Sequence, residues 1–197
     1  MPVRSSPTRP ALKERYERRH DELVRQAAHQ FARRGYDQTT MQELAASMGL
    51  ATGALYHYFA SKEELLAAIC DQLMEPLLAR ARVLEASPGD GERRLRELVR
   101  LWVAHVVEHR DHMLVFQQER HVIESGERWR SVRVSRKAFE RVVADALADV
   151  ATRAAKPLPL LALLGMVNHT AQWYRPRGAL SPEQIADGYV TLLLELH

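Results

Sequence analysis

The residues best suited to chemistry lie in one short stretch of the chain, between Thr40 and Lys62. It contains the run Tyr56-His-Tyr58, and the ammonium group of Lys62 follows four residues later. Phenol hydroxyls, an imidazole and an ammonium suit hydrogen bonds to phosphate oxygens and to base edges. Gly53 has no side chain, so a DNA backbone or base edge can approach the chain closely there. These residue types predict contacts with nucleic acid.

Two short helices are expected to position these side chains. Thr40-Met-Gln-Glu43 is typical of a capping box, in which the Thr40 hydroxyl accepts from the Glu43 amide and the Glu43 carboxylate returns to the Thr40 amide. The first helix follows this box and stops at Gly49, which can take the left-handed conformation of a tight turn. The second helix runs from about Thr52 to Phe59, and Thr52 is expected to cap it.

Two short helices joined at residues 49–51 have the layout of a helix-turn-helix. The small core expected between them consists of Leu44, Ala45, Leu55 and Phe59. With that core inward, Gly53, Tyr56 and His57 point outward, and Tyr58 lies at the flank. The alternative is an αα-hairpin without a DNA role, whose tyrosines simply cover the core.

The rest of the chain shows helical periodicity and almost no strand-like alternation, which predicts an all-α fold of about nine helices. Residues 1–10 carry three prolines and two serines and are expected to form a flexible N-terminal arm. Residues 11–60 then form a three-helix domain, and residues 61–197 form a second helical domain. The other expected helices are at about 11–34, 62–85, 91–109, 111–123 and 127–154, from Pro157, and after Ser181.

Charge is uneven along the 197 residues. The net charge is +3, yet residues 1–34 hold nine Lys or Arg against four Asp or Glu. A basic leading segment indicates an anionic partner near the N-terminus, either nucleic acid or a membrane surface. Because residues 11–34 carry few large apolar side chains, strong insertion into a membrane surface is disfavoured.

Several classes of protein are excluded by the sequence. The longest apolar run, residues 158–167, is too short to cross a bilayer, so no membrane partner is expected. The single cysteine, Cys70, excludes a disulfide framework, and no apolar segment follows the basic N-terminus, so we expect a cytoplasmic protein. The chain contains no GxSxG, P-loop or GxGxxG motif, so we expect neither an enzyme nor a cofactor.

Histidines form a second constellation. His105, His109 and His112 are spaced i, i+4 and i+7 on one predicted helix, with His121 nearby. This spacing can bind a divalent metal ion. No HExxH motif or carboxylate pattern accompanies it, so satisfied or partly exposed histidines are the favoured interpretation, and no metal site is expected.

Three motifs follow one another in this part of the chain: Gly35-Tyr-Asp-Gln-Thr-Thr-Met-Gln-Glu-Leu-Ala, then Met48-Gly-Leu, then Gly53-Ala-Leu-Tyr-His-Tyr-Phe-Ala-Ser-Lys-Glu-Glu-Leu-Leu66. Together they resemble the DNA-binding domain of TetR-family transcriptional repressors. Leu50-Ala51-Thr52 departs from the family's frequent Val-Ser-x. The resemblance covers roughly residues 16–70 and implies a homodimer that binds a double-stranded DNA operator. The residues it implies at the DNA are Thr40, Thr52, Gly53, Tyr56, His57, Tyr58 and Lys62.

The same resemblance implies a C-terminal ligand-binding domain that dimerises through its last two helices. Both segments are too apolar to leave in water, so a four-helix bundle across a two-fold axis is expected. The residues expected in this interface are Leu164, Ile185, Tyr189, Leu192 and Leu196.

Residues 168–186 are similar to the penultimate-helix segment of family members that sense acyl-CoA thioesters. The candidate effector-binding residues are Asn168, His169, Trp173, Arg175 and Arg177. Arginines suit the phosphates of a CoA group, and an aromatic ring suits its apolar or nucleotide parts. Three alternatives stay open: another apolar or aromatic effector, no ligand with Trp173 and Tyr174 as dimer packing, and a helical interaction module without DNA binding. Repression released by ligand is expected, with activation as an open alternative.

Overall fold

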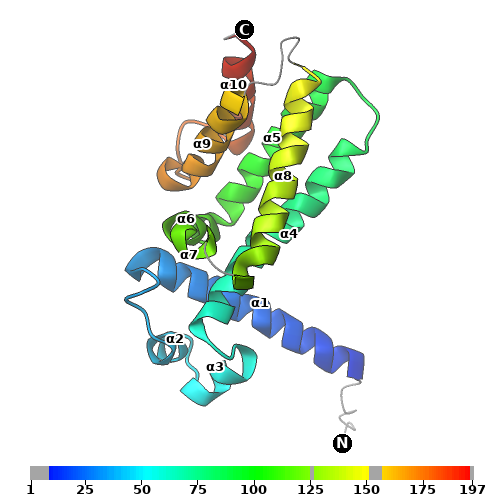
Figure 1. The fold of residues 1–197 in the computed structure, drawn as a ribbon. Helices are drawn as coiled ribbons and strands as arrows, with labels where there is room; N and C mark the ends of the chain where they lie inside the picture. Colours follow the sequence, from blue (N-terminus) through cyan, green and yellow to red (C-terminus); the bar gives the residue numbers. More distant parts are fainter. Residues whose placement is uncertain (1–8, 125–126, 151–156, 196–197) are drawn as a thin grey trace, which may run out of the picture. The chain divides into compact units, whose positions relative to one another are not determined.

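The computed structural model describes residues 9–124, 127–150 and 157–195, and within them the chain forms ten α-helices, one 3-10 helix and no strand. The all-α prediction is confirmed. The elements, labelled in Figure 1, are α1 (Arg9–Arg34), α2 (Met41–Ser47), α3 (Thr52–Tyr58), α4 (Lys62–Glu85), α5 (Gly91–Glu108), α6 (Arg110–Gln118), α7 (Arg120–Glu124), η1 (Glu127–Trp129), α8 (Arg130–Ala148), α9 (Pro157–Trp173) and α10 (Pro182–Glu195).

The chain divides into two units, Met1–Ile69 and Cys70–His197, and the division falls within α4. The first unit contains α1, α2, α3 and the beginning of α4. Its helix α1 buries the predicted apolar face, Leu23, Ala27 and Phe31. The core predicted for α2 and α3 is also confirmed, since each of these side chains is buried: Leu44, Ala45, Leu55 and Phe59.

Local interactions start and end the two short helices. The Glu43 amide donates to the Thr40 hydroxyl at 3.2 Å, and the Thr40 amide donates to the Glu43 carboxylate at 2.8 Å, so the predicted capping box is confirmed. Gly49 has a φ of 67°, as the turn requires. Capping by Thr52 was a wrong expectation. The extended residue before α3 is Ala51, which makes no side-chain cap, and Thr52 already belongs to the helix.

The second unit is built around α5, which packs against α8, α9 and α10. The indole ring of Trp102 meets the Phe139 ring edge-on, with centroids 4.9 Å apart, and so joins α5 to α8. A bidentate ion pair of 2.7 and 2.8 Å between Arg100 and Asp187 joins α5 to α10. The ion pair holds α10, and packing on α5 holds α9, so both helices expected in the dimer interface lie against the core of their own protomer.

The helix expected at 111–123 breaks at Glu119 into α6 and α7, which raises the number of α-helices above the predicted nine. Glu119 has φ −95° and ψ 17°, and no glycine or proline marks the break. Residues 1–8 of the expected arm, residues 151–154 of the expected 127–154 helix, and Leu196 lie outside the described residues. No helix among the described residues is long and apolar enough to span a membrane.

Candidate functional site

The outward face of α3 carries the predicted recognition residues. Leu55 is fully buried, whereas Tyr56 is 48% exposed and its neighbour His57 is exposed as well. A methyl group built at Gly53 would meet no protein atom within 4 Å, so this position is open to an approaching partner. The sequence predicted this arrangement, with Leu55 facing the core and Tyr56 and His57 facing outward.

Thr40 is exposed at the start of α2, where it is held by its capping box. Its hydroxyl also lies 2.8 Å from the Glu43 carboxylate, which accepts the hydroxyl hydrogen. Hydrogen bonds from the backbone and the side chain of Thr40 lower the pKa of Glu43 below its ordinary value. The capping box thus holds Thr40 through hydrogen bonds within a single turn of the chain.

Tyr58 lies at the flank of α3, and its position depends on α1. Its ring is stacked on the ring of Tyr16, with centroids 4.9 Å apart and planes 17° apart. His20 and Phe59 extend this contact, with ring centroids 4.7 Å apart. Tyr16 was absent from the residues predicted from sequence, because a ring stack between distant residues has no local signal.

Lys62, at the start of α4, is half-buried and already has partners in the first unit. Its ammonium donates a 2.9 Å hydrogen bond to the backbone carbonyl of Tyr36 and lies 4.2 Å from the centre of the Tyr36 ring. The structure therefore gives Lys62 a structural role. A contact with a phosphate stays a prediction.

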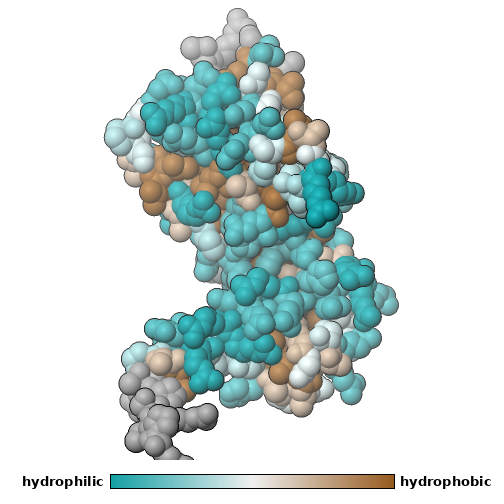
Figure 2. Space-filling model, turned by 180° about the vertical axis from the view of Figure 1, so that it is seen from behind, coloured by the Kyte–Doolittle hydropathy of each residue, from teal (hydrophilic) through white to brown (hydrophobic). Residues whose placement is uncertain are grey.

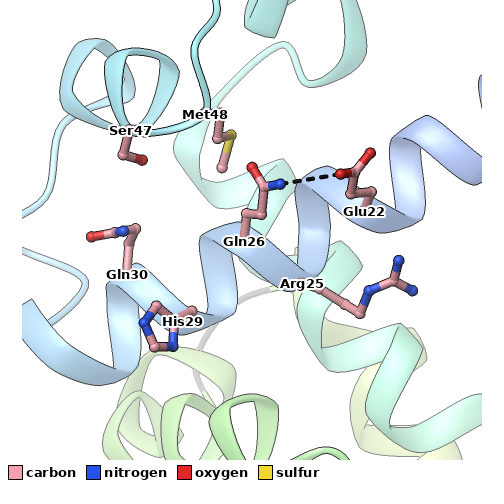
Figure 3. Close-up of a pocket in the computed structure, with 7 residues that line it drawn as sticks. All are labelled: Glu22, Arg25, Gln26, His29, Gln30, Ser47 and Met48. Carbon is pink, nitrogen blue, oxygen red and sulfur yellow. Dashed lines mark hydrogen bonds between the residues drawn. The ribbon is translucent and has the colours of Figure 1, made fainter.

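A groove lies between α1 and the end of α2 (Figure 3). On the α1 side of the groove, the Gln26 amide nitrogen donates a hydrogen bond to the Glu22 carboxylate at 3.3 Å. Its lining residues are Glu22, Arg25, Gln26, His29, Gln30, Ser47 and Met48. None of the residues predicted from sequence to bind DNA or effector lines this groove.

The predicted effector residues lie around the end of α9. His169 and Trp173 are both exposed and one helical turn apart, and Asn168 beside them is half-buried. Arg175 is exposed, and its guanidinium lies 3.2–3.5 Å from the carbonyl oxygens of Gln172, Trp173 and Tyr174. Arg175 therefore caps the end of the helix.

Arg177 is exposed, and the described part of the chain offers it no hydrogen bond or ion pair. The backbone carbonyl of Asn168 accepts a 2.9 Å hydrogen bond from Gln117, which ties this end of α9 to α6. Of the two candidate arginines, Arg177 is thus the one with an uncommitted guanidinium.

The residues predicted for the dimer interface differ in exposure. Ile185 is only 4% exposed and is packed inside its own protomer. Tyr189 is half-buried and its hydroxyl lies 2.9 Å from the Thr170 hydroxyl. Leu164 is half-buried, and Leu192 is exposed. Of the four described residues, Leu192 is therefore the most available for a contact with a second copy.

The histidine constellation lies in the second unit, where His105 and His112 are buried, His109 is half-buried and His121 is exposed. His105 donates from Nε2 to the Leu73 carbonyl at 2.7 Å, and its ring is stacked on that of His109, with centroids 4.1 Å apart. Burial, and next the neighbouring His109, lower the pKa of His105 to about 4, so this imidazole is neutral at pH 7. In the described part of the chain, no group of three His, Cys, Asp or Glu residues is arranged to hold a metal ion.

Two families match this chain. The family described as bacterial regulatory proteins, tetR family, matches residues 23–69, which contain α2 and α3. The family described as tetracyclin repressor-like, C-terminal domain, matches residues 88–197, more than half of the chain. The chain belongs to the TetR family. Repressors of the TetR family bind operator DNA as dimers and respond to small-molecule ligands, and neither matched family is one of enzymes.

Similar TetR-family proteins cover nearly the whole chain. The HTH-type transcriptional repressor KstR2 of Mycobacterium tuberculosis is 28% identical over 182 residues, which are 89% of this chain and 91% of that protein. The solved structure of the ketosteroid transcriptional regulator KstR2 of Mycobacterium tuberculosis has a TM-score of 0.81 at 27% identity and covers 90% of this chain and 93% of its own. The structure of AibR in complex with isovaleryl coenzyme A and operator DNA has a TM-score of 0.76 at 26% identity, with 89% and 98% covered.

Proposed function

We propose that this TetR-family chain is a ligand-responsive repressor that binds a pseudo-palindromic operator as a homodimer and is released by an acyl-CoA thioester. The observation that carries the DNA-binding part is the outward face of α3. There Gly53 is open to close approach, and the side chains of Tyr56 and His57 are exposed. A recognition helix in the major groove reads bases with such side chains, while neighbouring groups hold the phosphates.

The dimer is proposed to form through α9 and α10. The exposed face of α9 is apolar over its first half, where it carries Leu158, Leu161 and Gly165. Leu192 continues the apolar exposure on α10. Two copies that meet on these helices form a four-helix bundle and remove this surface from water.

The effector is proposed to be an acyl-CoA thioester, and this part rests on the relatives and on the end of α9. AibR was solved with isovaleryl coenzyme A, and the relative KstR2 is described as a ketosteroid regulator. On this chain, Trp173 offers an exposed aromatic ring and Arg177 an uncommitted guanidinium for a phosphate. Release is expected to need the thioester and not the free acid, because a free acid lacks the CoA phosphates that Arg177 would bind.

Release of DNA requires coupling between the effector and the α3 face. Helix α4 continues through the division between the two units, so it is the covalent path between them. A coupling free energy of about 1–3 kcal/mol would weaken DNA binding by about 5–150-fold. We propose that effector binding changes the position of α4 and thereby the spacing of the two recognition helices in the dimer.

The test is competition between DNA and effector. The DNA is a duplex selected by the wild-type protein from a random-sequence pool, and the competitors are a panel of acyl-CoA thioesters and the matching free acids. We expect the thioesters alone to release the duplex, and Trp173→Ala and Arg177→Ala to need higher thioester concentrations. Arg130→Ala is the matched control, because Arg130 is exposed on α8 and forms no hydrogen bond or ion pair in the described part of the chain.

Two outcomes would count against this function. If free acids release the duplex as well as the thioesters do, another apolar effector is the better account. If the wild-type protein selects no sequence from the pool, DNA binding itself is contradicted, and an interaction module becomes the better interpretation.

A further inference from the structure

The N-terminal half of α1 is a long helical segment with no part in the core. Helix α1 has 26 residues, but its first buried side chain is Leu23. Every described side chain from Pro10 to Glu22 is exposed or half-buried. Ring contacts attach this segment to the end of α3, Tyr16 with Tyr58 and His20 with Phe59.

Charges along this segment are unevenly placed around the helix. At 100° per residue, Arg15, Arg18 and Arg19 fall on one side of α1, and Arg25 continues that side two turns after Arg18. This side, the arginine face, also carries the carboxylate of Glu22. The adjacent side carries the carboxylates of Glu14, Glu17 and Asp21, so the segment as a whole is nearly neutral.

Two arginines of this face are uncommitted. Arg19 is paired with Glu22 at 2.7 Å, and on the other face Lys13 is paired with Glu17 at 3.6 Å. Arg15 and Arg18 are exposed, and neither forms a hydrogen bond or an ion pair with any described residue. Their guanidinium groups are therefore free to bind an external anion.

The arginine face lies beside the recognition helix. Tyr16 of α1 is stacked on Tyr58, the last residue of α3. One hollow of the surface is lined by both rings, by four arginines and by two carboxylates; its lining residues are Leu12, Arg15, Tyr16, Arg18, Arg19, Asp21, Glu22, Arg25 and Tyr58. In Figure 2 the lower part of the molecule is largely hydrophilic, with smaller tan and brown areas. The arginines therefore lie next to the last residue of α3.

We infer that Arg15 and Arg18 form a second, sequence-independent contact with the operator, binding the phosphates that flank the base pairs read by α3. The inference rests on the proposed function. A DNA duplex carries about one negative charge per 1.7 Å of its length, and guanidinium groups bind phosphates through two parallel hydrogen bonds. The stack of Tyr16 on Tyr58 sets the distance between this contact and the recognition residues.

A membrane surface is the competing anionic partner, and the observations favour DNA. An interfacial helix needs large apolar side chains opposite its basic face. The large apolar side chains exposed on this half of α1 are Leu12 and Tyr16, and Tyr16 is engaged with Tyr58.

The experiment measures how the affinity of the full chain for DNA depends on salt. Arg15→Ala and Arg18→Ala are compared with Lys13→Ala, which removes the same charge from the other face of the same helix. Two duplexes are used: one selected by the wild-type protein from a random pool, and one with the same composition in scrambled order. For each arginine variant, the slope of log affinity against log salt is expected to fall by about one unit.

Affinity for both duplexes is expected to fall by the same factor in the arginine variants, because phosphate contacts carry no sequence information. Hydroxyl-radical protection of the sugars flanking the selected site is expected to disappear in the double variant. Slopes and flanking protection equal to those of wild type would overturn the inference. Loss of binding to the selected duplex alone would also overturn it, because it would mean base reading.

Failure of the inference leaves the proposed function standing as long as wild-type protein selects a sequence. Anionic vesicles of phosphatidylglycerol and phosphatidylcholine provide the last arm. If the wild-type chain binds these vesicles and the arginine variants lose that binding while their DNA slopes stay unchanged, the surface belongs to a membrane, and the DNA inference is wrong.

Discussion

The ammonium group of Lys62 donates to the backbone carbonyl of Tyr36 at 2.9 Å while it lies 4.2 Å from the centre of the Tyr36 ring. One side chain thereby joins the start of α4 to the segment that follows α1. From the sequence, the Lys62 ammonium was predicted to contact a DNA phosphate. The structure shows a half-buried cation that stabilises the first unit.

Replacement of Lys62 tests this structural role. Lys62→Met is expected to lower the free energy of unfolding by about 1.5–3 kcal/mol, because it removes a charge-assisted hydrogen bond and a cation–π contact. Urea unfolding of the full chain measures the change. Lys13→Met, at an exposed lysine of α1, is the control and should unfold like wild type. A Lys62→Met protein with wild-type stability and weaker DNA binding would restore the phosphate role instead.

Removal of the Tyr56 hydroxyl is expected to weaken DNA binding without affecting the fold. The ring is 48% exposed, and the hydroxyl has no partner among the described residues. Tyr56→Phe should therefore keep the urea midpoint of wild type and lose about 0.5–1.5 kcal/mol of binding free energy, a drop in affinity of about 2–10-fold. Fluorescence anisotropy with the selected duplex measures the affinity. An unchanged affinity would place this hydroxyl outside the interface.

Addition of a methyl group at Gly53 should separate stability from DNA binding. Gly53 lies in α3 without a positive φ, and the added Cβ would meet no protein atom within 4 Å. Gly53→Ala is therefore expected to stabilise the fold by about 0.5–1 kcal/mol through helix propensity. Its methyl group would face the DNA, so we expect weaker binding to the selected duplex. Tighter or equal binding would show that no backbone or base approaches this residue closely.

Charges placed on the exposed apolar face of α9 and α10 should prevent dimerisation. Leu161 is 60% exposed and Leu192 is 54% exposed in the protomer. The double variant Leu161→Glu, Leu192→Glu is expected to sediment as a monomer, because burial of two carboxylates in an apolar interface is unfavourable. Val83 on α4 and Val134 on α8, 68% and 59% exposed, are the matched control positions. If both double variants sediment like wild type, the interface lies elsewhere.

Stability should fall between pH 6.5 and 4 because of His105. Burial lowers the pKa of this imidazole from 6.5 to about 4, with a further contribution from repulsion by His109. Between pH 6.5 and 4, the His105 imidazole is therefore protonated in the unfolded chain but largely neutral in the folded chain. The stabilising effect is complete above about pH 6.5 and is lost progressively as the pH falls to about 4.

The loss is expected to reach at most about 3 kcal/mol, and urea unfolding at a series of pH values measures it. Two charged groups near His105 act in opposite directions on its pKa: Glu108 raises it and Arg80 lowers it. His105→Gln should flatten the profile in this window, and the exposed His121→Gln should keep the wild-type profile. Identical profiles for wild type and both variants would show that His105 titrates normally.

Much of the structure of the candidate DNA-binding face could be predicted from sequence because that structure is local. The capping box of Thr40 and Glu43 closes within one turn, and Gly49 adopts the left-handed conformation that few other residues tolerate. Once both short helices are placed, the periodicity of an α-helix alone puts Leu55 inside and Tyr56 outside. Both the spacing of Thr40 and Glu43 and the periodicity of α3 can be read directly from the sequence, so this part of the candidate site was predictable.

Contacts between distant residues were decided by the tertiary structure alone. No pattern along the chain indicates that Tyr16 stacks on Tyr58 or that Lys62 reaches the carbonyl of Tyr36. The basic charge of residues 1–34 was visible, but its arrangement beside α3 was not. Ring stacks and side-chain hydrogen bonds of this kind depend on how helices pack, and packing is not a local property.

Ile185 and Leu192 show the same limit within one helix. They lie two turns apart on one stripe of α10, and hydrophobicity and periodicity therefore predict the same environment for both. The structure buries Ile185 and leaves Leu192 exposed. Sequence alone determined that this stripe is apolar. Only the tertiary structure decided which part is covered by the protomer itself, because coverage depends on how far the neighbouring helices extend along α10.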